Sequence, residues 1–245
     1  MLHLGYETLL LVGAAALAGS TLAAVTGFGG AAVLLPVLVI AFGARDAVPI
    51  LTVAQLVGNA SRVWFNRREL DYRVVAWFTV GAVPFGVLGG LLFAQAPLGA
   101  LTRLLGVFLL LVVVWRRLRP KANVKPTQRG FALIGAGASF LSALLGSVGP
   151  LMAPFFLAYG LVKGAYIGTE ALSTVVMHAT KLFAYRGAAV LPGSSIVAGL
   201  ALAPIMVAGS WIGKRLVDRL PERVFVLLIE ATMTAAGLLF AIRGH

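Results

Sequence analysis

The chain has 245 residues, of which 60% are hydrophobic and only 11% are charged, and its mean hydropathy is +0.98. Soluble domains carry roughly a quarter charged residues, so this composition predicts an all-α polytopic membrane protein without a sizeable soluble domain. The net charge of +12 is spread over the ends of apolar segments, which favours cytoplasmic loops of a membrane protein over nucleic-acid binding. There are no cysteines, so disulfides and thiolate metal sites are excluded.

Ten apolar segments follow one another along the chain. The N-terminal MLHLGYETLL has no Lys or Arg before its apolar run, so we expect the first segment to stay in the mature protein. Most segments approach the roughly 20 residues that a helix needs to cross a bilayer. Two are short, and whether these cross or re-enter is left open. The segments are 8–26, 28–42 (short), 47–65, 74–94, 98–115, 130–146, 148–160 (short), 164–185, 194–213 and 223–242.

The ten segments divide into two sets of five with matching landmarks, which predicts an internal repeat. We expect 1–117 to form a first transmembrane repeat, 118–129 a cytoplasmic linker and 130–245 a second repeat. The landmarks are Pro36 with Pro154, Pro84 with Pro204, and Pro97 with Pro221.

The charges of the loops predict how the two repeats lie in the membrane. The stretch 213–223 is rich in Lys and Arg, whereas its counterpart 94–99 has no charge. The opposite holds for the basic stretch 66–73, whose counterpart 185–193 has a single Arg. Charged and uncharged loops thus exchange places, so we expect an inverted-topology repeat. The positive-inside rule places 66–73, 116–130 and 213–223 in the cytoplasm and both termini outside.

Glycines interrupt the first repeat at TGFGGAAVLLPVLV (26–39), and a similar interruption lies near the start of the second short segment. Irregular backbone at membrane depth is tolerated where it is buried in protein or lines a cavity. Half-helix N-termini at such breaks present free N–H groups to anions, so we expect a substrate site near the midplane. Close packing of helices through small residues is the alternative. The glycines concerned are Gly27, Gly29, Gly30, Gly146 and Gly149.

A polar stripe follows each break. Gln55, Asn59 and Arg62 share one helical face, and the residues 119 positions later are Thr174, His178 and Lys181. Polar groups at membrane depth usually face a cavity or a partner, so these six residues are further substrate-site candidates. For the two cations a second interpretation stays open, in which each reaches toward the headgroups from a helix end.

Three ionisable residues within apolar segments are candidates for proton coupling. Glu170 and Glu230 could each pair with a cation or carry a proton, and His178 titrates near neutral pH. A packing role for His178 is the alternative.

Other classes of protein fit less well. An enzyme acting on lipid phosphates would need a cluster of acids, bases or metal ligands, and no HExxH motif or close pair of intramembrane carboxylates is present. We therefore expect no catalytic residues, no metal and no cofactor. No Walker-type sequence is present either, so energy must come from a gradient or a separate subunit. A non-transporting membrane subunit remains an alternative, and a homo-oligomer remains open.

Three stretches of the chain resemble the sulfite exporter TauE/SafE family, and the resemblance extends over nearly the whole chain. They are the glycine-rich break, its counterpart GASFLSALLGSVGPLMAPFFLAYGLVKGAYIGTEAL and the ending GSWIGKRLVDRLPERVFVLLIEATMTAAGLLF (209–240). The resemblance implies a multi-pass protein of the bacterial inner membrane that moves small sulfur-containing anions such as sulfite, sulfoacetate or thiosulfate. Another small anion, such as a carboxylate, is the alternative substrate. The second break departs from the family pattern of three adjacent glycines, since it reads Gly146-Ser147-Val148-Gly149-Pro150.

Overall fold

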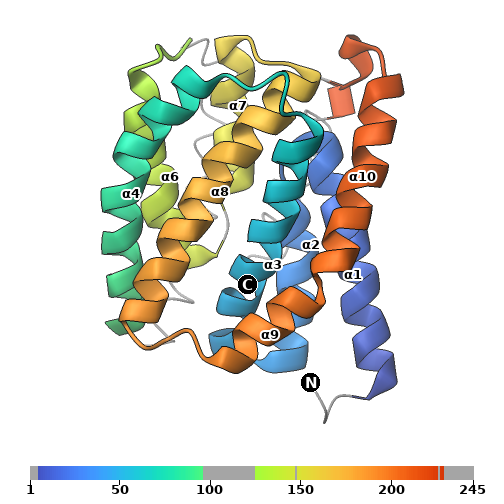
Figure 1. Ribbon diagram of the computed structural model, residues 1–245, viewed down its shortest axis with the longest axis vertical. Helices are drawn as coiled ribbons and strands as arrows, with labels where there is room; N and C mark the ends of the chain where they lie inside the picture. Colours follow the sequence, from blue (N-terminus) through green and yellow to red (C-terminus); the bar gives the residue numbers. More distant parts are fainter. Residues whose placement is uncertain (1–4, 96–124, 147, 226, 229–245) are drawn as a thin grey trace, which may run out of the picture.

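The computed structural model describes residues 5–95, 125–146, 148–225 and 227–228, and over these ranges it is a bundle of helices without a strand (Figure 1). The predicted all-helical class is therefore confirmed. Three helical stretches of this part are long and apolar enough to cross a bilayer, namely Tyr6–Thr26, Tyr72–Gln95 and Gly193–Arg219. The expected segment 98–115 and most of the segment 223–242 lie outside the described residues.

The first short segment folds back on the helix before it. Helix α1 (Tyr6–Thr26) ends at Gly27, and α2 (Gly30–Phe42) begins after Gly29. Both glycines have positive φ, 84° and 95°, which costs glycine little and other residues more. The two helices approach closely, since a Cβ on Gly30 would lie 3.0 Å from the carbonyl oxygen of Gly19. The pair is therefore a helical hairpin whose tip lies inside the protein.

The second short segment forms a similar hairpin from the opposite end of the bundle (Figure 1). It consists of α6 (Gly130–Leu145) and α7 (Gly149–Tyr159), and Gly146 closes α6 with φ 84°. Each hairpin leads into a long helix, α3 (Ala44–Phe65) or α8 (Lys163–Gly187). Corresponding boundaries are 119 residues apart: Thr26 and Leu145 end α1 and α6, Gly30 and Gly149 begin α2 and α7, and Ala44 and Lys163 begin α3 and α8.

Each hairpin is braced by a helix from the other half of the sequence. Helix α4 (Tyr72–Gln95) packs along α6, and α10 (Ala203–Arg219) packs along α1. Both contacts use glycines: a Cβ on Gly89 would lie 2.7 Å from the carbonyl oxygen of Phe140, and one on Gly209 would overlap the side chain of Ser20. Small residues let helix backbones approach in this way in membrane proteins. The small-residue packing considered for the glycine breaks is thus found between these pairs and also at the breaks themselves, where Gly30 and Gly149 lie close to neighbouring residues.

The tips of the two hairpins meet in the interior. Phe28 is 4% exposed, and a Cβ on Gly149 would lie 2.7 Å from its Cβ. Helices α3 and α8 pack against each other beside this junction. Apolar clusters lie on either side of it, one built mainly on α4 and α6–α8 and the other on α1–α3, α9 (Gly193–Ala201) and α10. The junction is therefore surrounded by packed protein.

The second half contains two features that the sequence did not indicate. The apolar segment 194–213 lies within the span candidate Gly193–Arg219, but a turn at Leu202 divides it into α9 and α10. Pro204, just after this turn, has no N–H to donate to the preceding helical turn. The stretch 213–223 is not simply a loop, because α10 continues to Arg219. Lys214 and Arg219 therefore lie on the last turns of a helix.

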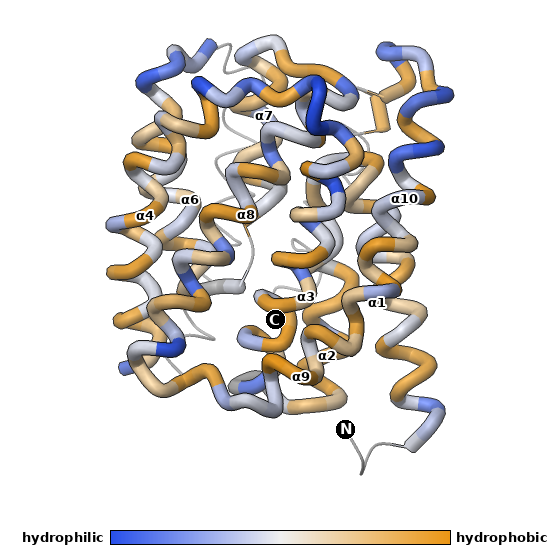
Figure 2. The backbone as a smooth tube through the Cα atoms, viewed as in Figure 1, coloured by the Kyte–Doolittle hydropathy of each residue, from blue (hydrophilic) through white to orange (hydrophobic). Residues whose placement is uncertain are grey.

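The charged ends of the elements gather at one end of the bundle. The α3–α4 turn, the start of α6 and the end of α10 lie together there, while α1 begins at the opposite end (Figure 1). Figure 2 shows hydrophilic residues concentrated at this charged end. Lys214 joins two of these elements through ion pairs with Glu69 at 3.6 Å and Asp218 at 2.7 Å. The predicted grouping of 66–73 with 213–223 is thus found, whereas 116–124 and the C-terminus lie outside the described residues.

Single-cysteine labelling tests which side of the membrane this end faces, since the chain has no native cysteine. Arg68, Thr127 and Glu222 are exposed at the charged end, and Glu7 is exposed at the other. Cysteines at the first three positions should react with a membrane-impermeant maleimide only after the cells are opened, because basic ends stay in the cytoplasm. Glu7→Cys should react in intact cells. Labelling of Arg68→Cys and Glu7→Cys from the same side would contradict the topology.

Candidate functional site

A cavity of about 30 Å³ lies where the two hairpin tips meet α3 and α8. Its volume accommodates roughly two water molecules, so the cavity is small. The structure brings ten of the eleven predicted substrate-site residues to its wall, and Lys181 is not on the wall. The ten are Gly27, Gly29, Gly30, Gln55, Asn59, Arg62, Gly146, Gly149, Thr174 and His178.

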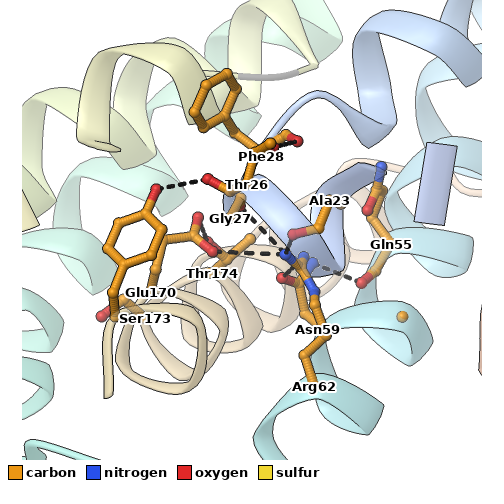
Figure 3. Close-up of polar contacts among 12 residues, drawn as sticks. Ala23, Thr26, Gly27, Phe28, Gln55, Asn59, Arg62, Glu170, Ser173 and Thr174 are labelled. Carbon is orange, nitrogen blue, oxygen red and sulfur yellow. Dashed lines mark hydrogen bonds and ion pairs between the residues drawn. The ribbon is translucent and has the colours of Figure 1, made fainter. Parts of the chain in front are cut away.

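Arg62 closes the C-terminal end of α1. Its Nη1 donates to the carbonyl oxygens of Ala23 at 2.8 Å and Gly27 at 3.2 Å, and its Nη2 donates to Oδ1 of Asn59 (Figure 3). The last carbonyls of a helix have no intrahelical donor and carry a partial negative charge. A buried guanidinium supplies both the hydrogen bonds and the opposite charge.

Lys181 does the same for α6 in the second half of the chain. Its Nζ donates to Oγ of Ser142 at 3.0 Å and to the carbonyl oxygens of Ser142 and Gly146, both at 3.4 Å. Lys181 follows these two residues in the chain by 39 and 35 positions, the same intervals that separate Arg62 from Ala23 and Gly27. The two cations are therefore equivalent helix-end clamps.

The burial of the two cations rejects the interpretation that each reaches toward the lipid headgroups from a helix end. Arg62 is 4% exposed and Lys181 is 0% exposed, so neither reaches toward the headgroups. Arg62 therefore does not contribute to the charge of the loop that follows it. Both side chains turn inward because the uncapped carbonyls at the hairpin tips are the acceptors within reach.

The N-terminal ends of α2 and α7 complete the hairpin tips. No side chain caps either helix, and Gly30, Ala31 and Gly149 line the cavity. The first N–H groups of a helix lack intrahelical acceptors and attract anions. The two tips are not identical, since Gly29 has φ 95° whereas its counterpart Val148 has φ −137°.

Side chains of α3 and α8 form the polar wall. Nδ2 of Asn59 donates to the carbonyl oxygen of Gln55 at 2.7 Å, and Gln55 is 6% exposed beside Gly30. On α8, Oγ1 of Thr174 donates to Oε1 of Glu170 at 2.9 Å. Most of the polar atoms of this wall are thus already paired within the protein.

Two buried polar atoms of the cavity wall have no hydrogen-bond partner. These are Oε2 of Glu170 and Nδ1 of His178. The nearest cation to the carboxylate is Arg62, whose Nη1 lies 3.8 Å from Oε2 (Figure 3). Buried polar atoms without a partner usually face a water, an ion or a ligand. Of the proton-coupling candidates, Glu170 and His178 therefore lie at the cavity, and Glu230 lies outside the described residues.

Two residues of the site were missed at the sequence level. Tyr166 donates from its hydroxyl to the carbonyl oxygen of Thr26 at 2.9 Å and holds α8 against the first hairpin tip. Ser142 lines the cavity and accepts from Lys181. The residue 119 positions before Ser142 is Ala23, which is apolar, so matching the two halves of the chain did not indicate a polar residue there. Among the described residues, no group of three His, Asp or Glu side chains could hold a metal ion.

Comparison with known proteins places the chain in a family. Searches of curated proteins and of solved structures found no significant match. The model of the family described as sulfite exporter TauE/SafE matches residues 11–240, which include both hairpins and both polar stripes. Because this match covers nearly the whole chain, the protein belongs to the sulfite exporter TauE/SafE family.

Proposed function

We propose that the protein is a secondary transporter that carries sulfite, an organosulfonate or another small sulfur oxyanion across the bacterial inner membrane. Membership of the TauE/SafE family implies a membrane transporter of sulfur anions. The cavity is the proposed substrate site, and the ten predicted residues on its wall are its proposed lining. The proposal involves no catalytic residue, cofactor or metal.

The arrangement of helix ends around the cavity is the observation that carries the proposal. The C-terminal ends of α1 and α6, which carry partial negative charge, are closed by Arg62 and Lys181. The N-terminal ends of α2 and α7 have no capping side chain and lie at the cavity. Partial positive charge therefore remains for a bound anion. An anion that leaves water needs such donors in compensation.

The charges of the buried side chains agree with an anionic substrate. Arg62 and Lys181 are two cations, and Glu170 is the one carboxylate at the cavity wall. With Glu170 ionised, the described site has an excess of one positive charge. A buried excess charge is costly without a counterion. A transported anion supplies that counterion.

Alternating access through two inverted repeats is the proposed mechanism. It is supported by the two hairpins, which enter from opposite ends, and by the constant interval of 119 residues between their boundaries. Movement of one braced hairpin relative to the other would open the cavity to one side of the membrane at a time. The two repeats, 1–117 and 130–245, and the linker 118–129 are part of this proposal.

Counterflow in reconstituted vesicles tests the proposed function. Vesicles loaded with unlabelled sulfite, thiosulfate, sulfoacetate or a carboxylate are diluted into the same labelled anion. We expect saturable entry of at least one sulfur anion and slower entry of the carboxylate, because membership of the TauE/SafE family implies sulfur anions as substrates. Equal entry into protein-free vesicles, with folded protein verified by gel filtration, would reject transport. Preference for the carboxylate would reject the sulfur specificity.

Substitution of Arg62 and Lys181 tests whether these side chains hold the hairpin tips in place or bind the substrate. Arg62→Gln and Lys181→Gln each remove the side-chain donor from two buried carbonyls. The carbonyls of Ala23 and Ser142 keep a backbone N–H donor, so the loss falls on those of Gly27 and Gly146, at a cost of about 1–3 kcal/mol per unpaired group. Both variants should unfold at lower temperature without substrate and should lose at least tenfold in maximal counterflow rate. Arg62→Lys and Lys181→Arg should recover part of both losses.

The controls are Arg67→Gln and Arg186→Gln, whose side chains are exposed on or beside the same two helices. Both should behave as the wild type. If Arg62→Gln and Lys181→Gln keep their thermal stability and only raise the KM of transport, the cations are direct substrate ligands rather than clamps.

A further inference from the structure

We propose that Glu170 binds the proton that travels with the anion, so that the protein is a proton–anion symporter with one proton site per chain. This inference rests on the proposed function and names its coupling ion. The proton would bind to Oε2 of Glu170 from the water on one side of the membrane and leave to the water on the other. No bond other than this O–H bond forms or breaks.

The position of Glu170 meets the first requirement of a coupling site, contact with the substrate cavity. The side chain is 3% exposed and lies on the cavity wall. Thr174 donates to Oε1, whereas Oε2 has no hydrogen-bond donor. A buried ionised carboxylate normally has donors on both oxygens. An O–H on Oε2 would instead be able to donate to a bound anion.

The neighbouring cation, Arg62, does not donate a hydrogen bond to Oε2 of Glu170. Arg62 lies 3.8 Å from Oε2, beyond hydrogen-bond distance, and its guanidinium already donates to Ala23, Gly27 and Asn59. The pair is therefore an ion pair without a hydrogen bond. Because Arg62 is held by the hairpin tip, it stays in place when the charge of Glu170 changes.

The other groups around Glu170 define its electrostatic surroundings. Arg62 on α3 and Tyr166 on α8 interact with it electrostatically. The hydroxyl of Tyr166 donates to the carbonyl oxygen of Thr26 on α1. His178 lines the same cavity, and Lys181 lies buried a turn beyond. The remaining elements of the wall contribute backbone groups, uncharged amides and hydroxyls, and apolar side chains.

Binding of an anion in this cavity must strengthen proton binding at Glu170. Two negative charges in a small, poorly solvated space repel each other, and a proton on the carboxylate removes the repulsion. By thermodynamic reciprocity, the proton then strengthens anion binding by the same factor. With Glu170 protonated, Arg62 and Lys181 offer two positive charges, which matches a doubly charged sulfur oxyanion.

The two repeats differ at this position, which limits the number of coupled protons. The counterpart of Glu170 in the first repeat, 119 residues earlier, is Leu51. Leu51 is fully buried and lies near the second hairpin tip, where Cδ2 would be 3.9 Å from a Cβ on Gly146. The second hairpin tip thus has an apolar side chain where the first has a carboxylate. Among the described residues, Glu170 is therefore the one carboxylate of the cavity wall that can carry a coupled proton.

Thiosulfate transport under a pH gradient tests the inference, because thiosulfate stays a dianion throughout the neutral pH range. In vesicles with the membrane potential clamped by potassium and valinomycin, the wild type should accumulate thiosulfate up to about tenfold per unit of pH gradient at one proton per anion. Glu170→Gln should lose this accumulation, and its counterflow, measured separately, reports how much transport the variant keeps. Glu7→Gln, which alters an exposed carboxylate far from the cavity, should accumulate like the wild type.

A second measurement does not depend on the folding of Glu170→Gln. Purified wild-type protein in weakly buffered detergent should take up protons when thiosulfate is added, as reported by a pH-sensitive dye. Glu170→Asp, which keeps a carboxyl group, should retain proton uptake. Absence of counterflow in the wild type would reject the proposed function and this inference with it. Counterflow without pH-driven accumulation, or unchanged accumulation in Glu170→Gln, would reject Glu170 as the coupling site alone.

Discussion

The hydrogen bonds from two buried cations to the carbonyl ends of two half-helices are the interactions on which the rest of this structure depends. Backbone groups in hydrocarbon must find partners within the protein, and a helix that stops inside the bundle leaves several unpaired. Arg62 and Lys181 supply partners for the ends of α1 and α6. The hairpins in turn bring the N-terminal ends of α2 and α7 to one cavity.

The same arrangement explains why the site is asymmetric in charge although its backbone is nearly symmetric. Both clamps satisfy carbonyls at the same chain intervals, but only Arg62 has a carboxylate beside it. The exchange of bracing helices, α4 onto the second hairpin and α10 onto the first, divides the molecule into two packed bodies. These bodies meet at α3, α8 and the Phe28–Gly149 contact, beside the cavity. A small displacement there would change access to the site.

Much of this could be predicted from the sequence because membrane depth restricts what polar and glycine residues can do. Apolar composition predicted the helical class, and the interval of 119 residues aligned the breaks and the polar stripes that line the cavity. The orientation of the Arg62 and Lys181 side chains could not be predicted. The helical face fixes the position of the Cβ atom, but it does not determine which acceptor the end of a long side chain reaches. Tyr166 was missed because an aromatic residue in an apolar helix is usually a packing residue. Its hydrogen-bond partner is a backbone carbonyl, which no residue type in the sequence indicates. The turn at Leu202 depends on a single proline within an otherwise continuous apolar run.

Anomalous diffraction from crystals soaked in selenite, the selenium analogue of sulfite, would locate a bound anion relative to the helix ends. We expect a selenium peak in the cavity, within hydrogen-bond distance of the backbone amides of Gly30, Ala31 or Gly149, while Arg62 and Lys181 keep their bonds to the ends of α1 and α6. A peak held directly by the side chains of Arg62 and Lys181, with those carbonyl bonds broken, would contradict this expectation. So would occupancy only at the surface of the bundle.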